Sequence, residues 1–371
     1  MVFIVWKYAP NNAGFLRHWS LLNGVVEQGI DVDCYFLLPS KESINVNCSN
    51  LHCHCVGDKY SRLNKILILF CSLLFVLRRI KKNEIVFSTS FWLVLFCLSF
   101  KKIRLFLEWN EYPPLMFSKN ILGSLLLRFH LRVLKKKATK VFVISEGIKE
   151  YFIDNGISEE KICVLNMTVD LKRFENVEKQ KTGRYIAYCG TVSNYKDGVD
   201  VLLEAFAIVA KKHKDVKLYI LGNTPYKEDK EKNERIIKEN NIEERVFMPG
   251  MISGVLMPQY LKNAEILALA RPDNIQAKYG FPTKLGEYLL TANPVVLTRV
   301  GEMDRFLVDG ESCLFAEPDN VQDFADKLLW LLEHPKEGRV LGERGYVVAK
   351  QSFNYLIESK KIVEVIKSLS I

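Results

Sequence analysis

Short apolar runs and amphipathic segments alternate along the chain. The apolar run 2–6 (VFIVW) is followed by a polar loop, by helical spacing of hydrophobic residues over 15–28, and by a second strand-like run at 31–38. The same order returns at 185–206 and at 266–298, where the runs YIAYCG, ILALA and PVVLT flank helical segments. Continuous apolar runs of this length are typical of parallel strands that are covered on both faces. The pattern therefore predicts an α/β protein built from strand–helix–strand units.

One polar stretch divides the chain into two parts of ordinary domain size. The segment 175–183 (ENVEKQKTG) has no apolar period and has the composition of a linker. A length of 371 residues is sufficient for two hydrophobic cores. We predict a first domain over 1–175, a second domain over 184–350, and an amphipathic helix within the C-terminal segment 351–371.

The segment after the strand 266–270 combines a polar loop with a helix start. The residues 280–283 (GFPT) put a proline in a first turn, where it is tolerated, and the helix KLGEYLLTA follows. On this helix Lys284, Glu287 and Tyr288 share one face by their spacing. Lys284 lies beside free backbone N–H groups and suits a phosphate, whereas Glu287 suits a pair of sugar hydroxyls. A solvated Lys–Glu pair is the alternative, which a position at the carboxyl edge of a sheet disfavours.

Two further loops carry a glycine after a strand. In the second half, Gly190 ends the strand YIAYCG, and the loop TVSNYKDG contains Lys196 just before a helix. A lysine in front of a helix N-terminus can pair with a phosphate as a point charge. In the first half, Gly14 follows the first strand, where it is either a plain turn glycine or a functional one.

Positive charge and apolar runs gather in the first half of the chain. The formal net charge is +9, and the block from Lys59 to Lys140 holds 17 basic residues against three acidic ones. It includes the apolar runs 66–77 and 91–100, both shorter than the roughly 20 residues that span a bilayer, and the basic amphipathic segment 121–140. The block predicts contact with an anionic membrane surface, although an ordinary helix with a solvated basic face also fits 121–140. Interleaved aliphatic rather than aromatic residues disfavour nucleic acid as a partner.

The cysteines fit a reducing compartment. Nine are scattered without the spacing of a disulfide framework, and MVFIVWKYAP has the pattern of a strand and a loop rather than a secretory signal, which predicts free thiols in the cytoplasm. The stretch LHCHC at 51–55 invites a metal interpretation. In a strand, however, successive side chains point to opposite faces, and no second ligand pair stands at zinc spacing. We therefore expect a buried strand here and no metal site.

A resemblance to a known family appears in the run from Arg271 through GFPTKLGEYL to NPVV, which resembles the nucleotide-sugar signature of family 4 glycosyltransferases. That family has two glutamates eight positions apart. Glu287 matches the second, which contacts the ribose of the nucleotide, whereas Tyr279 stands where the first holds hydroxyls of the donor sugar. Lys196 matches the lysine that binds the diphosphate. Thr191 replaces an arginine that often follows the strand glycine, and we expect Arg271 to supply that charge.

The resemblance implies a fold and a reaction. Family members are retaining enzymes of the GT-B fold, with two Rossmann-like domains whose parallel sheets face a central cleft, and a C-terminal helix that crosses back to the first domain. We expect transfer of a hexose-like sugar from a UDP- or GDP-sugar to a hydroxyl of a lipid-linked or glycan acceptor, as in lipopolysaccharide or capsule synthesis at the inner face of the cell membrane. No metal or other cofactor is expected, because positive side chains would stabilise the leaving diphosphate. A nucleotide-sugar epimerase of the same fold and a non-catalytic nucleotide-binding scaffold are the alternatives.

The residues expected in the site fall into two groups. Glu108 and Glu111 follow the strand start LFL in a stretch that resembles the acceptor-side loop of the family, where they would bind acceptor hydroxyls, or Glu111 would act as a base; two exposed loop acids are the alternative. The nucleobase is expected near Met251–Ser253. The catalytic candidates are Lys196, Arg271, Lys284 and Glu111, and the donor-binding candidates are Gly14, Gly190, Tyr279, Gly280, Phe281, Pro282, Thr283 and Glu287.

Overall fold

The computed structural model describes residues 1–10, 12–40, 44, 48–89, 92–117, 120–180 and 183–369. The chain divides into two compact units. Unit 1 comprises Met1–Asn166 and Tyr355–Ile371, and unit 2 comprises Met167–Asn354. The segment 167–175, which the predicted boundary leaves in the first domain, therefore belongs to unit 2, where Val169 forms a bridge with Asn354.

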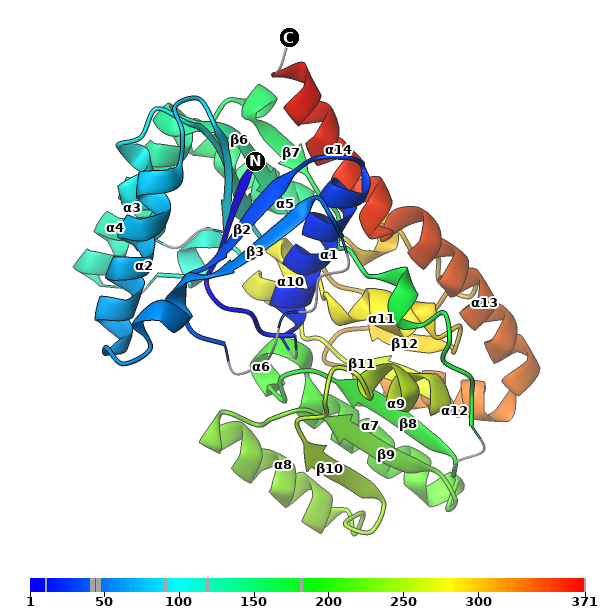
Figure 1. Cartoon of the computed structure of the whole chain (residues 1–371). Helices are drawn as coiled ribbons and strands as arrows, with labels where there is room; N and C mark the ends of the chain where they lie inside the picture. The colour runs from blue at the N-terminus through cyan, green and yellow to red at the C-terminus, as the bar shows by residue number, and fades with distance from the viewer. Residues whose placement is uncertain are drawn as a thin grey trace. The chain divides into compact units, whose positions relative to one another are not determined.

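Unit 1 is a parallel sheet flanked by helices (Figure 1). Among the described residues the strand order is β3-β2-β1-β4-β5-β6-β7, so the direction of strand addition reverses between β1 and β4. Ligands of open α/β sheets bind at the carboxyl edge near such a reversal. The strands are β1 (Val2–Val5), β2 (Val32–Phe36), β3 (Leu51–Cys55), β4 (Ile85–Thr89), β5 (Arg104–Trp109), β6 (Ala138–Val143) and β7 (Ile162–Val164). The helices are α1 (Ala13–Glu27), α2 (Lys65–Arg79), α3 (Trp92–Ser99), α4 (Ile121–Lys137), α5 (Glu146–Asp154) and α14 (Tyr355–Ser368), with the short 3-10 turns η1 (Val56–Tyr60), η2 (Pro113–Leu115) and η3 (Glu159–Lys161).

Aromatic side chains from four neighbouring strands form the centre of unit 1. Phe3 stacks on Phe87 with 4.7 Å between ring centroids, and the ring of Phe142 lies 5.6 Å from those of Phe87 and Phe106. All four rings are buried. Burial of large aromatic surface is a main source of folding free energy, so the apolar runs of the sequence become the strands of this core.

The C-terminal helix α14 returns to unit 1 and lies beside α1 (Figure 1). Gln28 Nε2 donates a hydrogen bond to Ser359 Oγ at 2.8 Å, and Tyr355 Oη donates to the Glu27 carboxylate at 3.1 Å. At Gly24 an added Cβ would lie 2.2 Å from Ser359 Oγ, so the helices approach closely where one of them has no side chain. The predicted return of this helix to the first domain is confirmed.

Unit 2 contains a second parallel sheet, whose order among the described residues is β10-β9-β8-β11-β12-β13. Together the two parallel sheets confirm the predicted α/β class with two Rossmann-like domains. The strands are β8 (Tyr185–Cys189), β9 (Lys217–Leu221), β10 (Val246–Gly250), β11 (Ile266–Leu269), β12 (Val295–Thr298) and β13 (Leu314–Ala316). The helices are α6 (Asn194–Asp197), α7 (Val199–Lys212), α8 (Lys227–Glu239), α9 (Met257–Asn263), α10 (Ile275–Tyr279), α11 (Lys284–Leu290), α12 (Val321–Glu333) and α13 (Pro335–Ser352), with the 3-10 turns η4 (Leu171–Arg173) and η5 (Met303–Arg305).

Candidate active site

The ends of two neighbouring strands and the start of α11 meet at the carboxyl edge of the unit 2 sheet. β8 ends at Cys189 and is followed by Gly190, while β11 ends at Leu269, two residues before Arg271. The first residue of α11, Lys284, lies against this edge. Three of the twelve residues predicted for the site therefore lie near the edge where open α/β sheets bind ligands: Gly190, Arg271 and Lys284.

Gly190 has a backbone conformation that only glycine adopts readily, with φ at +141°. Its N–H donates to the Leu221 carbonyl at 2.9 Å, which fixes the turn to the neighbouring strand. An added Cβ would lie 2.4 Å from Lys284 Nζ. The predicted glycine therefore makes room for the head group of the predicted lysine.

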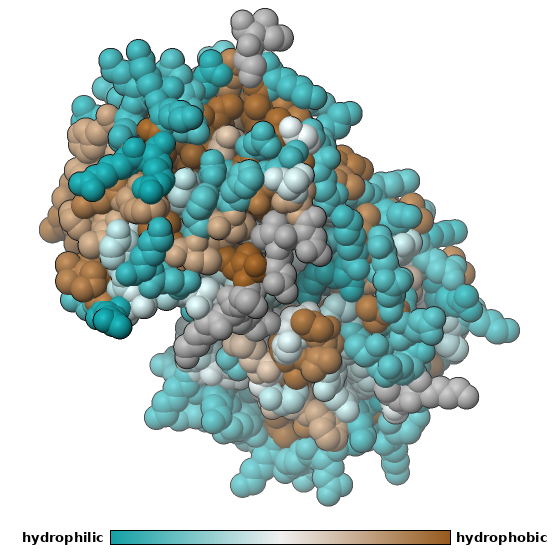
Figure 2. Space-filling view, viewed as in Figure 1, coloured by the Kyte–Doolittle hydropathy of each residue, from teal (hydrophilic) through white to brown (hydrophobic). Residues whose placement is uncertain are grey.

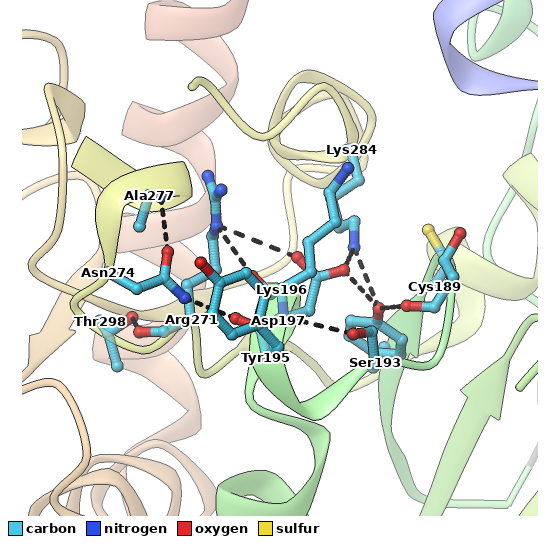
Figure 3. A network of polar contacts seen from close by, with 12 residues as sticks. Cys189, Ser193, Tyr195, Lys196, Asp197, Arg271, Asn274, Ala277, Lys284 and Thr298 are labelled. Carbon is cyan, nitrogen blue, oxygen red and sulfur yellow. Dashed lines mark hydrogen bonds and ion pairs between the residues drawn. The ribbon is translucent and has the colours of Figure 1, made fainter. Parts of the chain in front are cut away.

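Figure 3 shows Lys284 turned towards Asp197. Lys284 Nζ donates to Asp197 Oδ2 and also to Tyr188 Oη, the latter at 3.1 Å. Arg271 approaches the other carboxylate oxygen, with 4.0 Å between its Nε and Asp197 Oδ1. The side chains of Asp197 and Arg271 are only 2% and 3% exposed. Two cations thus share one buried carboxylate, and the cluster retains net positive charge.

Burial sets the electrostatics of this cluster. Burial by itself raises the pKa of the Asp197 carboxyl, but Lys284 and Arg271 outweigh it and hold that pKa below its usual value. Burial lowers the pKa of Lys284, and Asp197 opposes part of the shift. Burial and then Asp197 raise the pKa of Tyr188, so the phenol keeps its proton and donates it to Asp197 Oδ2 at 2.6 Å.

One face of α11 is directed at the end of β8. Tyr288 lies one turn after Lys284, and its Oη accepts a hydrogen bond from the Cys189 N–H at 2.7 Å. Leu285 and Leu289 are fully buried. The helix has only seven residues, so we attribute most of the positive charge here to side chains rather than to the helix dipole.

Glu287 is held by an arginine from the beginning of unit 2. Arg173 Nη1 donates to Glu287 Oε1, and Arg173 Nη2 donates to the Gly254 carbonyl at 2.9 Å. The two side chains are 19% and 16% exposed, so the carboxylate is not turned into bulk solvent. Sequence reasoning did not identify Arg173, which stands 114 positions before its partner.

Lys196, in the short helix α6, and Arg271, in the loop after β11, are tied together through the backbone (Figure 3). The Lys196 side chain is half-buried, and its carbonyl accepts a hydrogen bond from Arg271 Nε at 3.3 Å. Asn274 Nδ2 donates to the Tyr195 carbonyl at 2.6 Å. These bonds fix α6, which carries Lys196, to the loop that follows β11.

The segment that leads into α11 is anchored by its hydrophobic members. The ring of Phe281 lies 5.5 Å from those of both Phe306 and Phe353, and Pro282 is buried beside it. These two candidates pack in the interior of unit 2 and hold the loop in place. The remaining candidates of the segment are partly exposed: Tyr279, Gly280 and Thr283.

Glu108 belongs to the interior of unit 1. It lies in β5, and its Oε1 is 3.0 Å from Arg17 Nη2, while its Oε2 is 2.9 Å from His18 Nε2. Burial by itself raises the pKa of Glu108, but His18 and Arg17 lower it below its usual value. The alternative interpretation of Glu108 as an exposed loop acid is therefore wrong, because its carboxylate is buried between Arg17 and His18.

The remaining two candidates also lie in unit 1. Gly14 is in the first turn of α1, which begins at Ala13 and is capped by the side chain of Asn12, rather than in a loop before the helix. Glu111 is partly exposed, two positions after the end of β5. The other site candidates all lie in unit 2.

No group of three or more His, Cys, Asp or Glu side chains in the described ranges is arranged to hold a metal ion. The stretch LHCHC forms strand β3, as expected, but the expected burial is wrong: only Leu51 is buried, because β3 is the terminal strand of the sheet among the described residues. There His54 Nε2 lies 2.8 Å from Asp33 Oδ1, and its ring stacks on Tyr35 with 4.6 Å between centroids.

Unit 1 exposes hydrophobic side chains on α2, α3 and α4. Ile66 and Phe70 follow each other at helical spacing on α2, and Ile66 is 79% exposed; Ile121, at the start of α4, is 82% exposed. Figure 2 shows brown surface among teal along the left edge of unit 1, where Figure 1 places these helices. As far as the chain is described, no helix has both the length and the apolar character needed to cross a bilayer. We call the exposed hydrophobic side chains of these three helices the apolar face; it comprises Ile66, Leu67, Phe70, Leu74, Phe96, Ile121, Leu122 and Leu125.

Comparisons with known proteins bear on the class of the chain. Residues 183–334 match the family described as Glycosyl transferases group 1. The Campylobacter jejuni N-acetylgalactosamine-N,N'-diacetylbacillosaminyl-diphospho-undecaprenol 4-alpha-N-acetylgalactosaminyltransferase is 27% identical over 331 residues, which cover 87% of this chain and 83% of that protein. The Mycolicibacterium hassiacum MMP alpha-(1->4)-mannosyltransferase is 27% identical over 225 residues, which cover 60% of this chain and 52%, about half, of that protein.

Solved structures share the architecture of the chain. HepE from Anabaena in complex with UDP-glucose has a TM-score of 0.76 at 16% identity, covering 99% of both chains. Sucrose-phosphate synthase from Thermosynechococcus elongatus also has a TM-score of 0.76 at 16% identity, covering 99% of this chain and 98% of the other. At such low identity these likenesses establish the fold, which is GT-B.

The fold, the matched domain and the curated relatives agree with one another. The resemblance to family 4 glycosyltransferases found in the sequence is confirmed for residues 183–334, which match a glycosyltransferase family, and the chain as a whole is similar to glycosyltransferases. The relatives named above are glycosyltransferases, which does not favour the epimerase or the scaffold.

Proposed function

We propose that the chain transfers a sugar from a nucleoside diphosphate sugar to a hydroxyl acceptor with retention at the anomeric carbon. The observation that carries the proposal is the buried cluster of Lys284, Arg271 and Asp197 at the carboxyl edge of the unit 2 sheet. Negative charge grows on the leaving diphosphate, and fixed cations in a poorly solvated site stabilise it without reorganisation. Asp197 neutralises only one of the two cations. Retention follows from the resemblance to family 4, and the proposal involves no metal ion.

The donor is proposed to lie along the edge formed by Gly190 and α11. Its diphosphate would lie near Lys284 and Lys196, its ribose would bind Glu287, and its base would lie near the loop Met251–Ser253. The contact between Lys284 Nζ and Gly190 supports this placement, because a side chain at position 190 would occupy the same space. A structural neighbour holds UDP-glucose, which supports a UDP-sugar over a GDP-sugar.

Two candidates are proposed to contact the reacting sugars. Tyr279 stands in place of a family glutamate, and its phenol can both donate and accept a hydrogen bond without carrying charge. We assign it to the hydroxyls of the donor sugar. Glu111, partly exposed after β5, is assigned to the acceptor hydroxyl as a binding group or base.

The acceptor is proposed to be a lipid-linked glycan in the synthesis of a surface polysaccharide. The name of the Campylobacter jejuni relative contains a diphospho-undecaprenol acceptor. The apolar face of unit 1 is bordered by cations, since Arg78 and Arg79 end α2 and Lys135, Lys136 and Lys137 end α4. Exposed apolar helices with basic flanks bind at the headgroup region of anionic membranes. We therefore propose that the chain associates peripherally with the inner face of the cell membrane.

Replacing Lys135, Lys136 and Lys137 with glutamine is expected to reduce cosedimentation with anionic liposomes. Each basic residue near such a surface contributes about 1 kcal/mol, so the loss of three charges is expected to weaken binding at least tenfold at physiological salt. A matched control replaces three exposed lysines of unit 2, Lys211, Lys212 and Lys214, and removes the same net charge. Equal partitioning of the two triple variants would contradict a specific role for the end of α4.

Replacing Asp197 with asparagine is expected to move the alkaline limb of the kcat/KM profile to lower pH. Lys284 stabilises the diphosphate only while protonated, and burial already lowers its pKa, with Asp197 opposing part of the shift. Without that carboxylate the pKa falls further, so the amine loses its proton at a lower pH. Asp200→Asn is the control, because it removes the same charge nearby but Asp200 pairs with Lys232. Superimposable profiles of wild type and Asp197→Asn would count against the assignment.

The function is tested first by donor binding and then by turnover. A panel of UDP-, GDP- and ADP-sugars is screened for thermal stabilisation of the protein. The selected donor is then incubated with and without undecaprenyl-diphosphate-linked glycans. Release of nucleoside diphosphate that depends on the acceptor supports the transferase. Formation of an epimerised free sugar nucleotide would contradict the transferase. Tight donor binding without turnover in the presence of any tested acceptor would also contradict it.

A further inference from the structure

A single guanidinium connects the two parts of unit 2 that the proposed nucleoside site uses. Arg173 donates through Nη1 to Glu287 Oε1 on α11 and through Nη2 to the Gly254 carbonyl at 2.9 Å. Gly254 directly follows the loop 251–253, to which the base is assigned. An arginine fork can hold two acceptors at fixed geometry, which a lysine cannot.

The backbone before Arg173 is held by hydrogen bonds and by contact with α11. Val169 N donates to the Phe353 carbonyl at 2.8 Å, and Asp170 Oδ1 accepts from the Lys172 N–H at 3.0 Å, which caps η4. An added Cβ at Gly286 would lie 2.2 Å from Met167 Cε. Van der Waals contact with α11 therefore begins several residues before Arg173, so the guanidinium approaches Glu287 from a rigid support.

The ion pair leaves part of the carboxylate available. Among the described residues, the hydrogen bonds and ion pairs of Glu287 all use Oε1. The other oxygen, Oε2, remains an acceptor for a hydroxyl. Because an unconstrained glutamate populates several rotamers, a fixed partner on one oxygen orients the other before a ligand arrives.

Charge also favours a paired carboxylate at this place. A nucleoside diphosphate is an anion. The proposed site places the diphosphate of the donor at Lys284, three positions before Glu287. A bare carboxylate near this anion would repel it, whereas the pair with Arg173 is neutral overall and still offers an oxygen that accepts hydrogen bonds.

We propose that Arg173 is a positioning residue that orients Glu287 towards the ribose and thereby sets the selectivity of the chain for ribonucleotide over deoxyribonucleotide donors. This inference rests on the proposed function, since it assumes a nucleoside diphosphate at the edge of unit 2. It assigns to Arg173 no contact with the sugar that is transferred.

The test compares ribonucleotides with their deoxy analogues in wild type and in Arg173→Met. Calorimetry measures Kd for UDP, 2′-deoxy-UDP and 3′-deoxy-UDP, with the corresponding GDP or ADP series if the thermal panel selects that base. Wild type is expected to prefer the ribonucleotide over at least one deoxy form by about tenfold or more, as for a hydrogen bond to a charged group. In Arg173→Met this preference is expected to fall to within about twofold, through weaker binding of the ribonucleotide alone.

Two further variants keep the test decisive if Arg173→Met is poorly folded. Arg173→Lys keeps the charge but cannot hold both Glu287 and the Gly254 carbonyl, so its preference is expected to be intermediate. Lys172→Met is the control, because Lys172 is the exposed neighbour in η4, and it is expected to keep the wild-type preference.

The possible outcomes distinguish a failure of the role proposed for Arg173 from a failure of the proposed function. An unchanged preference in Arg173→Met and Arg173→Lys overturns the role of Arg173 while donor binding stands. Tighter ribonucleotide binding in Arg173→Met shows that Arg173 competes with the ribose, which also overturns it. A wild type that binds nucleoside diphosphates without discriminating deoxy forms refutes the orientation of Glu287 alone. A wild type that binds none of them refutes the proposed function as well.

Discussion

Replacing Lys284 with methionine is expected to lower kcat about 100- to 1,000-fold, the range found when one preorganised donor to a developing negative charge is removed. The Lys284 side chain is 12% exposed, so solvent screens its charge only weakly. Its Nζ lies against Gly190, where the diphosphate is assigned. Acceptor-dependent release of nucleoside diphosphate, measured at saturating donor, gives kcat directly.

The loss of activity could also arise from Asp197, the buried carboxylate that loses its lysine partner in this variant. In Lys284→Met, the partners that Asp197 keeps among the described residues are Arg271 and the Tyr188 hydroxyl, and a buried carboxylate that lacks its main counter-ion is costly. The double variant Lys284→Met/Asp197→Asn removes this carboxylate. We expect it to remain as impaired as the single variant. Recovery to within about tenfold of wild type would show that Asp197, not the loss of the ammonium, causes the defect.

Replacing Arg17 with methionine is expected to destabilise unit 1 by about 3–5 kcal/mol, the cost of breaking a buried ion pair from one side. Arg17 is buried, and besides Glu108 it donates to the Asn166 carbonyl at 2.6 Å and to the Leu165 carbonyl at 2.9 Å. Its loss leaves a carboxylate and two carbonyls in the interior. Hydrogen exchange measured by mass spectrometry resolves the effect by unit, and peptides of unit 2 are the internal reference.

The pH dependence identifies the carboxylate as the cause. In wild type the pKa of Glu108 lies below its usual value. The charged carboxylate therefore stabilises unit 1 fully at pH values above the usual pKa of a glutamate. This contribution is lost as the pH falls through the folded-state pKa. Without Arg17 burial dominates and the pKa rises. The stability difference between variant and wild type is therefore expected to be large at pH 7 and to shrink towards pH 4. Arg62→Met, at an exposed position of unit 1, is the control, and a pH-independent difference would contradict this account.

Periodicity was sufficient to predict most elements of both sheets. β1, β8 and β11 are short apolar runs next to a glycine or a polar loop, and such runs are long enough for a covered strand and too short for a helix. The strand β4 was not predicted, because its five residues lie between two longer apolar runs that form α2 and α3. A short strand next to long apolar helices adds little to a periodic signal.

The candidate site was predictable as far as its residues are local to one element. The spacing of Lys284 and Tyr288 places both towards β8, and the glycine after that strand receives the lysine head group. Asp197 was visible in the sequence as the residue after Lys196, yet nothing local shows that it is buried between two cations. Its partners lie 87 and 74 positions further along the chain.

The sequence alone determined most individual strands and helices, the glycine after β8 and the face of α11, because each depends on residue spacing within a few positions. Which charges meet was decided only by tertiary structure. Glu108 became an interior carboxylate through Arg17, 91 positions earlier, and Glu287 acquired Arg173, 114 positions earlier. A charged side chain carries no local sign of its partner, since desolvation makes a partner necessary but folding selects which one is near.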